Sequence, residues 1–443
     1  MSLFRKSAAD SQPGRPFFAS LVPLTARPTF FYDIRSAPLN GVFLGVMTLL
    51  PWVLKHTLGG SDWEVAVLSA AGPTAHLLDI WYAHLCADRP KMPFVLWPGL
   101  VARFLIIVAG LAVNSAMLVI VAAISYIVGS MATPAVNSIW RNNYPGTHRY
   151  RVLGTVMAVM NLCMGLTAFS AGLLLRLFDN HWLFRVVFAV GAVAGMVGVY
   201  VFSRIKVVGE DAGDARGPAP RGRFNLWRDI GLLWRDRKFG KYQLIQFTSG
   251  FANIMTMPVL IALLKDQGVG WLAAALVLGF APNMAKSLTM PFWGRLLQRF
   301  NPMQARAFFN MVWAAGYILI ALSGSQVGWV FLAKLITGTA QGATTLLWTL
   351  QQMYFARRED VPKYMGVHCT LTGVRGLVAP FVGVLLMKSV FQGSAHWVFV
   401  VSAALSVGVG LLSLRMGLRE SRETNHTGHV DGGALVDYTD DEA

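Results

Sequence analysis

Long apolar runs, each separated from the next by a short group of charged residues, recur along the whole chain. A helix needs about 20 apolar residues to cross the hydrocarbon core of a bilayer. Runs of this kind lie near residues 37–58, 63–86, 94–114, 116–140, 152–176, 183–203, 241–264, 270–297, 305–322, 327–354, 365–387 and 396–415. Only 14% of the residues are charged, against about 25% in a soluble protein. We therefore expect an all-α membrane protein with twelve transmembrane helices.

The basic residues predict how these helices are oriented. The chain carries 38 Lys and Arg against 22 Asp and Glu, a net charge of +16. In the twelve-helix arrangement most of the basic residues fall on the side of the two termini, which the positive-inside rule assigns to the cytoplasm. The sequence thus predicts a multi-pass protein of the cell membrane, a bacterial inner membrane, with both termini cytoplasmic. The excess of basic residues is explained by the orientation of the helices in the membrane, so no nucleic-acid partner is expected.

These features divide the chain into five segments. They are a cytoplasmic N-terminal segment (1–36), a six-helix half (37–203), a cytoplasmic linker (204–240), a second six-helix half (241–415) and a disordered cytoplasmic tail (416–443). The linker is rich in Gly, Pro, Arg and Asp, a composition that cannot bury enough apolar area to fold alone. Its end predicts a short amphipathic helix from Asn225, with Trp227 and Trp234 on the membrane surface. A solvated linker with chance periodicity is the alternative.

Two pairs of glycines indicate an internal repeat. Gly165 and Gly172 lie in the fifth run, and Gly376 and Gly383 lie in the eleventh, each 211 residues later and each pair followed by three apolar residues. Six plus six helices in the same orientation are typical of two parallel repeats related by an axis along the membrane normal.

A short motif at the end of the second run resembles the major facilitator superfamily. That family carries G-x-L-a-D-r-x-G-r-k after helix 2, and H-L-C-A-D-R-P-K from His84 keeps Asp88 and Arg89 but lacks both glycines. A second copy, after the eighth run, keeps Gly294 and Arg299. The resemblance implies that these four residues form a cytoplasmic latch and that the two halves rock about a central site.

Ionisable side chains within the apolar runs are the main candidates for function, because a charge at mid-bilayer costs at least about 2.5 kcal/mol. Asp79 and Arg375 reach similar depths in the second and eleventh runs, and the resemblance implies that these helices meet. We expect the pair to form in one state and to separate as a gate, or else to be a permanent pair that fixes helix register. His76, three residues before Asp79, is a candidate for proton coupling or a structural hydrogen bond.

Lys286 is the first candidate for binding a solute. It lies in a helix interrupted by Pro282 and Pro291, where its ammonium can bind an anionic group, reach the interface, or pair with Asp79. Lys334 is expected near the outer end of its run, within reach of the interface. Three polar side chains, on helices that line the central cavity in the resembled family, are expected either to donate hydrogen bonds to the solute or to join helices. These are Gln246, Asn253 and Gln341.

The predicted function is secondary active transport of a small polar, anionic solute by alternating access, with or without proton coupling. Phosphate-loop, zinc-protease and nucleophile-elbow motifs are absent from the sequence, so no enzyme activity or cofactor is expected. Cys86, Cys163 and Cys369 show no C-x-x-C spacing, so neither a disulfide nor a metal site is predicted. We expect a monomer whose partners are the solute, the lipid bilayer and protons. The alternatives are a non-transporting scaffold or assembly protein and a lipid-handling protein on the same fold.

Overall fold

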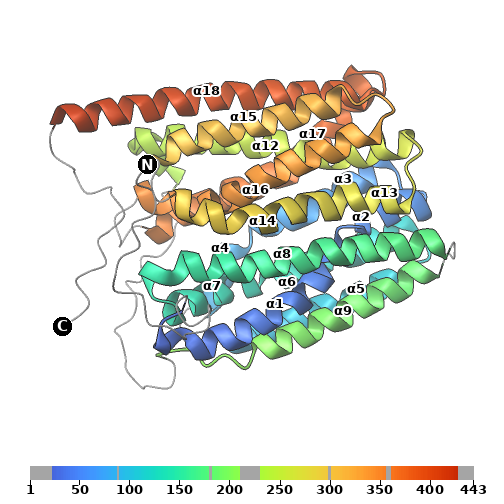
Figure 1. Ribbon diagram of the computed structural model, residues 1–443, viewed down its shortest axis with the longest axis horizontal. Helices are drawn as coiled ribbons and strands as arrows, with labels where there is room; N and C mark the ends of the chain where they lie inside the picture. Colours follow the sequence, from blue (N-terminus) through green and yellow to red (C-terminus); the bar gives the residue numbers. More distant parts are fainter. Residues whose placement is uncertain are drawn as a thin grey trace, which may run out of the picture.

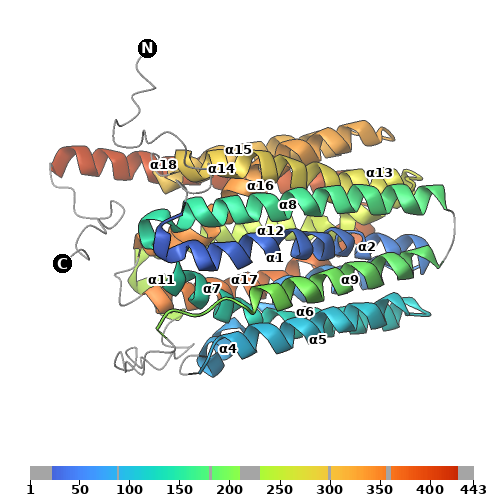
Figure 2. The ribbon, with the colours of Figure 1, turned by 60° about the horizontal axis from the view of Figure 1, so that its bottom comes forward.

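The computed structural model describes residues 22–86, 89–178, 182–209, 230–297, 301–355 and 361–427. Within these ranges the regular elements are helices, and the long ones run roughly parallel in one bundle (Figure 1). Two groups of helices lie side by side, one drawn from each half of the chain. A second view keeps α5, α6 and α9 on one side and α15 and α18 on the other (Figure 2).

The helices of the first group are η3 (Leu24–Ala26), α1 (Arg27–Met47), α2 (Leu50–Trp52), η4 (Val53–Thr57), α3 (Asp62–Ala75), α4 (Asp79–Cys86), α5 (Met92–Gly110), α6 (Ser115–Ser130), α7 (Ala132–Asn143), α8 (Gly146–Leu177) and α9 (Leu183–Phe202). Those of the second are α11 (Leu232–Arg235), α12 (Arg237–Asp266), α13 (Trp271–Ala275), η5 (Leu276–Phe280), α14 (Ala281–Leu296), α15 (Pro302–Ala321), α16 (Val327–Phe355), α17 (Val361–Leu385), η7 (Leu386–Val390) and α18 (Ala395–Thr427). We call the end of the bundle that holds the connections 58–61, 111–114, 267–270, 322–326 and 391–394 the far end, and the opposite end the terminal end.

Helix length and exposed apolar surface both fit a lipid environment. In the described part of the chain, nine helices are long and apolar enough to cross a membrane. Large apolar side chains stand on their outward faces, such as Trp97 at 65% exposed, Val190 at 60% and Leu288 at 77%. Continuous surfaces of this kind are unfavourable in water but not in hydrocarbon. The all-α membrane fold is confirmed, while the number of twelve crossings stays a prediction.

Local capping explains where several helices begin. Ser61 accepts a hydrogen bond from the Glu64 amide while the Glu64 carboxylate accepts one from the Ser61 amide, which is a capping box at the start of α3. Asn114 and Asp236 cap α6 and α12 by accepting from backbone amides two or three residues into the helix. These caps fix the entry of helices at both ends of the bundle.

The second predicted span is not one helix. It divides into α3 and α4, which are separated by a turn at residues 76–78 after Pro73. Proline has no amide hydrogen to donate and its ring crowds the preceding turn. The chain continues through bonds from Leu77 to Thr74 and from Leu78 to Ala75, both 2.9 Å, which are the shorter i to i−3 type.

The ends of the predicted segments also differ from the structure. α1 begins at Arg27, ten residues before the predicted first span, and α18 continues to Thr427 where a disordered tail was predicted from residue 416. Both extensions lie at the terminal end, where apolar content no longer marks the helix. Residues 210–229, which hold most of the predicted linker and the start of its amphipathic helix, lie outside the described residues.

Glycines set the contact between the two groups of helices. On α8, Gly165 faces Met284 of α14 and Gly172 faces Ala275 of α13. On α17, Gly376 lies so close to α3 that an added Cβ would stand 2.8 Å from the Pro73 carbonyl carbon. The fifth span thus meets the eighth, and the eleventh meets the second. These two pairs are equivalent under the six-helix repeat that the glycine spacing predicted.

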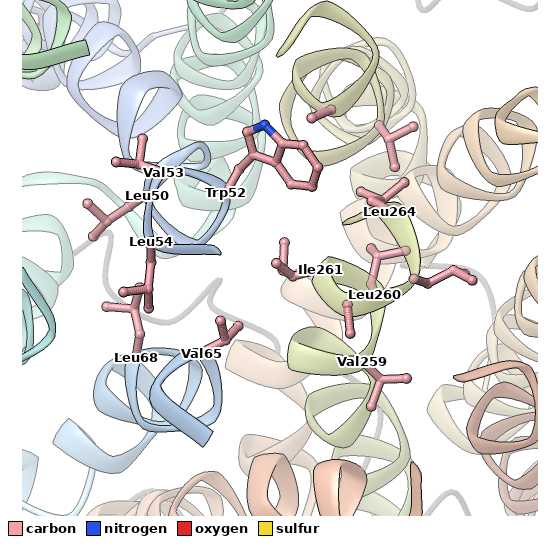
Figure 3. Packing of buried hydrophobic residues seen from close by; sticks show 14 of the residues in the cluster. Leu50, Trp52, Val53, Leu54, Val65, Leu68, Val259, Leu260, Ile261 and Leu264 are labelled. Atoms are coloured by element: carbon pink, nitrogen blue, oxygen red, sulfur yellow. The ribbon is translucent and has the colours of Figure 1, made fainter. Parts of the chain in front are cut away.

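The far end is closed by apolar packing between the two groups. Leu50, Trp52 and Leu54 come from α2 and η4, and Val259 and Leu264 come from α12. Each of these five side chains has no exposed surface. Figure 3 shows these side chains, with Trp52 and Ile261 in the space between the two helices. We call this cluster the far-end seal, and burying one such side chain stabilises the closed arrangement by about 1.5–3 kcal/mol.

Candidate functional site

The break between α3 and α4 brings together the first two predicted site residues. Asp79 is the first residue of α4, and its Oδ2 atom lies 2.7 Å from Nδ1 of His76. The aspartate is 8% exposed, and its Oδ1 atom has no hydrogen-bond partner among the described residues. A buried carboxylate therefore has one imidazole partner and one unused acceptor. The carboxylate can therefore accept a further hydrogen bond.

A row of rings connects this pair to the second half. The His76 ring lies 5.7 Å from the indole of Trp348 on α16, and that indole lies 5.3 Å from the ring of His368 on α17. Nδ1 of His368 lies 3.2 Å from Oε1 of Gln243 on α12. The sequence analysis did not select His368, although it lies on the same face of α17 as Arg375, which follows seven residues later.

Arg375 does not pair with Asp79 in this structure. It is 6% exposed, and its Nη1 atom donates to the Gln246 carbonyl at 2.5 Å, with its guanidinium against the backbone of Gly250. The two charges nevertheless belong to adjacent helices, because the Leu77 amide lies against Gly373. The Cys369 thiol lies within electrostatic reach of both charges. Each charge thus has a local partner here and a possible second partner on the neighbouring helix.

Lys286 and Lys334 lie on the neighbouring helices α14 and α16. The two helices approach closely, since a Cβ on Gly338 would stand 2.8 Å from Pro282 Cα. Both lysines are half-buried and interact electrostatically. Among the described residues neither has a carboxylate within 4 Å. That Lys334 reaches the membrane interface stays a prediction.

The predicted neutral residues have different surroundings. Gln246 is buried and leaves Oε1 without a partner, whereas Asn253 donates to the hydroxyl of Tyr317 at 3.2 Å. Gln341 is half-buried, and its carbonyl accepts from the Thr345 hydroxyl. Asn253 thus joins α12 to α15. Gln246 and Gln341 keep side-chain groups that can meet a solute.

The predicted latch falls mostly outside the described residues. Asp88 and Arg299 lie outside them, Arg89 is exposed, and Gly294 is within α14. No geometry between the four residues follows. In the described part of the chain, no group of three His, Cys, Asp or Glu residues lies close enough together to hold a metal ion.

An ion cluster at the far end was missed by the sequence analysis. Asp62 lies 2.6 Å from Nζ of Lys55 and 2.9 Å from Nζ of Lys388, and Asp266 interacts with both Asp62 and Lys55. Lys388 and Asp266 belong to the second half, so the cluster joins the two halves beside the far-end seal. No local pattern signals it, because Asp62 and Lys388 lie on helices far apart in sequence.

The charge state of Asp62 follows from its surroundings. Partial burial raises its pKa, but hydrogen bonds and attraction from Lys55 and Lys388 outweigh this effect, so the net pKa lies below the usual value. The carboxylate is therefore ionised at neutral pH and holds both lysines. We call these three residues the far-end clamp.

Solved structures with the same fold are membrane transporters. The nucleoside transporter NupG is 12% identical in sequence with a TM-score of 0.67, covering 88% of this chain and 99% of its own. A bacterial homolog of the human lysosomal transporter Spinster, inward-facing and unoccupied, is 16% identical with a TM-score of 0.63, covering 90% and 98%. The peptide transporter POT in complex with alafosfalin is 15% identical with a TM-score of 0.67, covering 93% and 97%.

Sequence comparison assigns the family. No curated protein matches the chain significantly. The family model of the Major Facilitator Superfamily matches residues 39–281 and again residues 242–435. Together the two matches cover nearly the whole chain and overlap at its middle. The chain therefore belongs to the Major Facilitator Superfamily, as the residues after its second apolar run predicted, and it is a multi-pass membrane protein with the fold of a transporter.

Proposed function

We propose that the protein carries a small organic anion across the cell membrane by alternating access. The observation that supports this most is the Lys286–Lys334 pair, two ammonium groups that interact electrostatically and have no carboxylate within 4 Å among the described residues. Like charges that lie together in a region of low dielectric constant repel each other, and a bound anion relieves the repulsion. Gln246 and Gln341 are proposed to donate hydrogen bonds to the same solute, with Asn253 fixing α12 beside them.

Proton coupling is assigned to the His76–Asp79 pair. The 2.7 Å contact and the unused Oδ1 atom give this pair the chemistry to take up one proton. Protonation removes the negative charge of Asp79, and deprotonation restores it. We propose that the charged carboxylate attracts Arg375 and that the neutral one releases it, so that the proton controls the gate between α4 and α17.

Alternating access requires two conformations, and the one in this structure has a closed far end. With the termini in the cytoplasm, the far end faces outward, and the seal and the clamp exclude external solute in this state. Opening the far end separates Lys388 from Asp62. The latch residues Asp88, Arg89, Gly294 and Arg299 are proposed to act at the opposite, cytoplasmic end, and the carrier to act as a monomer.

Uptake by sealed vesicles tests the proposal. Purified protein is reconstituted into liposomes and offered a panel of labelled carboxylates, phosphates, amines and neutral solutes, each with and without an inward proton gradient. We expect accumulation of an anion that Lys286→Gln or Lys334→Gln reduces at least tenfold, and that Lys241→Gln, a change to an exposed lysine at the start of α12, leaves unchanged.

Two outcomes would contradict the proposal. Accumulation of amines alone would exclude an anionic solute. The absence of accumulation by any solute, in protein with a normal melting temperature, would favour a non-transporting scaffold. Proton coupling has its own readout, since Asp79→Asn must abolish the response to the gradient while the protein stays folded.

A further inference from the structure

A buried polar layer lies between α12 and α17. His368, Thr372 and Arg375 stand at positions i, i+4 and i+7 of α17 and so share one face. They are 1%, 6% and 6% exposed. On α12, Gln243 Oε1 lies 3.2 Å from His368 Nδ1, and the backbone carbonyl of Gln246 accepts a hydrogen bond from Arg375 at 2.5 Å. Five buried polar residues thus lie along the contact between the two helices.

Each of the five side chains keeps a polar atom without a hydrogen-bond partner among the described residues. These atoms are His368 Nε2, Thr372 Oγ1, Arg375 Nε, Gln243 Nε2 and Gln246 Oε1. Buried polar groups are almost always hydrogen-bonded, so five such atoms in one layer need an explanation. Arg375 Nε, Gln243 Nε2 and the Thr372 hydroxyl are donors. The layer therefore presents several donors and one permanent positive charge to whatever lies between the helices.

Among the described residues, no carboxylate lies within 4 Å of the Arg375 guanidinium. Between residues 241 and 415 the only acids are Asp266, Glu359 and Asp360. Asp266 ends α12 about 30 Å from Gln246 at 1.5 Å per residue. Glu359 and Asp360 lie outside the described residues. Asp236, which caps the other end of α12, accepts a hydrogen bond from the Tyr364 hydroxyl at 2.9 Å. Arg375 therefore has no ion-pair partner in the described part of its own half.

A second guanidinium increases the imbalance. Arg306 on α15 is 3% exposed, lies over the ring of Tyr242, and interacts electrostatically with Arg375 and His368. Asp79, on the adjacent helix α4 of the other half, has its Oδ2 atom 2.7 Å from His76 Nδ1. Buried charges are retained in proteins when a counter-ion or hydrogen bonds compensate them.

We propose that this layer is a binding site for one small anion, held by Arg375, Gln243 and Thr372 with Arg306 supplying further positive charge. The anion is either a free inorganic ion or the acidic group of an organic solute. In the second case the inference rests on the proposed transport of an anion. Asp79 and the bound anion are alternative partners of Arg375, so occupancy of the site opposes closure of the Asp79–Arg375 gate.

Thermal stability of the purified full-length protein tests the site without any transport. The apparent melting temperature is measured against increasing sodium bromide, and separately against small organic acids, at ionic strength held constant with a bulky sulfonate. We expect a saturable rise in the wild type. Arg375→Gln should remove this rise. Thr372→Val keeps the shape of the side chain but removes one hydrogen bond to the charged ligand, so it should weaken apparent binding about tenfold.

A matched control is a half-buried arginine of the first half. Arg103 on α5 donates to Asn40 Oδ1 at 2.7 Å and to the Gly99 carbonyl at 3.0 Å. Arg103→Gln should therefore keep the full anion response, even if its melting temperature is lower. If Arg375→Gln does not fold, Thr372→Val and Gln243→Leu carry the test.

The outcomes separate the two sources. Saturation by bromide identifies a free ion, and saturation only by organic acids identifies the acidic group of a solute. A wild type that responds to neither, or variants of the layer that respond like the wild type, overturns the site. Failure of the transport proposal is distinct, because Lys286→Gln can abolish uptake while the anion-dependent melting temperature stays unchanged.

Discussion

Lys388→Gln is expected to open the far end of the bundle without unfolding the protein. Of the two lysines on Asp62, Lys55 belongs to the same half and keeps its bond when the halves separate. Lys388 belongs to the other half, so its bond exists only while the far end is closed. Glutamine keeps two of the four side-chain methylenes and a polar end, so the substitution removes the charge and shortens the side chain.

The magnitude follows from the geometry and the exposure of the pair. A hydrogen bond between charged groups contributes about 1.5–3 kcal/mol when shielded from water. The Lys388 side chain is 41% exposed and that of Asp62 is 13% exposed, and exposed pairs contribute only about 0.2–1 kcal/mol. We take about 1 kcal/mol, which changes the ratio of closed to open molecules about fivefold. The far-end seal remains, so the population shifts and the bundle does not come apart.

Distances between spin labels in liposomes measure this ratio. Labels at Val113 and Ser325 stand on exposed far-end connections of the two halves. They require a background in which the native cysteines are replaced. Lys388→Gln should increase the long-distance population relative to the wild type. Lys265→Gln, a change to an exposed lysine at the same end, should not. An unchanged distribution, or an equal change in both variants, would refute the clamp.

Three further predictions concern the clamp, the interface and a helix cap. Because the folded pKa of Asp62 is lowered, its contribution is complete above the usual Asp pKa near 3.9 and is lost as pH falls below that value; label distances should be constant from pH 8 to 5 and lengthen below about pH 4. Gly376→Leu should destabilise by about 1–3 kcal/mol through overpacking against α3, seen as a lower melting temperature, whereas Gly408→Leu, with no neighbour within 4 Å, should have little effect. Glu64→Gln weakens both the capping box and the 2.5 Å bond from Ser115, and should cost about 1 kcal/mol in the same measurement; no change in melting temperature would show that neither contact matters.

The sequence by itself determined the class of fold and which ionisable residues lie within the apolar runs. Apolar runs of spanning length permit only helices, since hydrocarbon offers no partner for free backbone groups. An ionisable residue is unusual within such a run. For this reason Asp79, Arg375 and Lys286 were selected from the sequence as candidate site residues. The spacing of Gly165 and Gly376 likewise predicted which helices are equivalent.

The tertiary structure decided how helices end and which side chains pair. Pro38 and Pro98 lie inside continuous helices, yet Pro73 precedes a break, where Gly376 of another helix packs against it. Asp79 contacts His76 instead of Arg375, and Asp62 contacts Lys388 of the other half. These choices depend on distances of a few ångströms between helices that are remote in sequence. Hydrophobic periodicity specifies which face of a helix is buried, but not which residue of a neighbouring helix lies opposite.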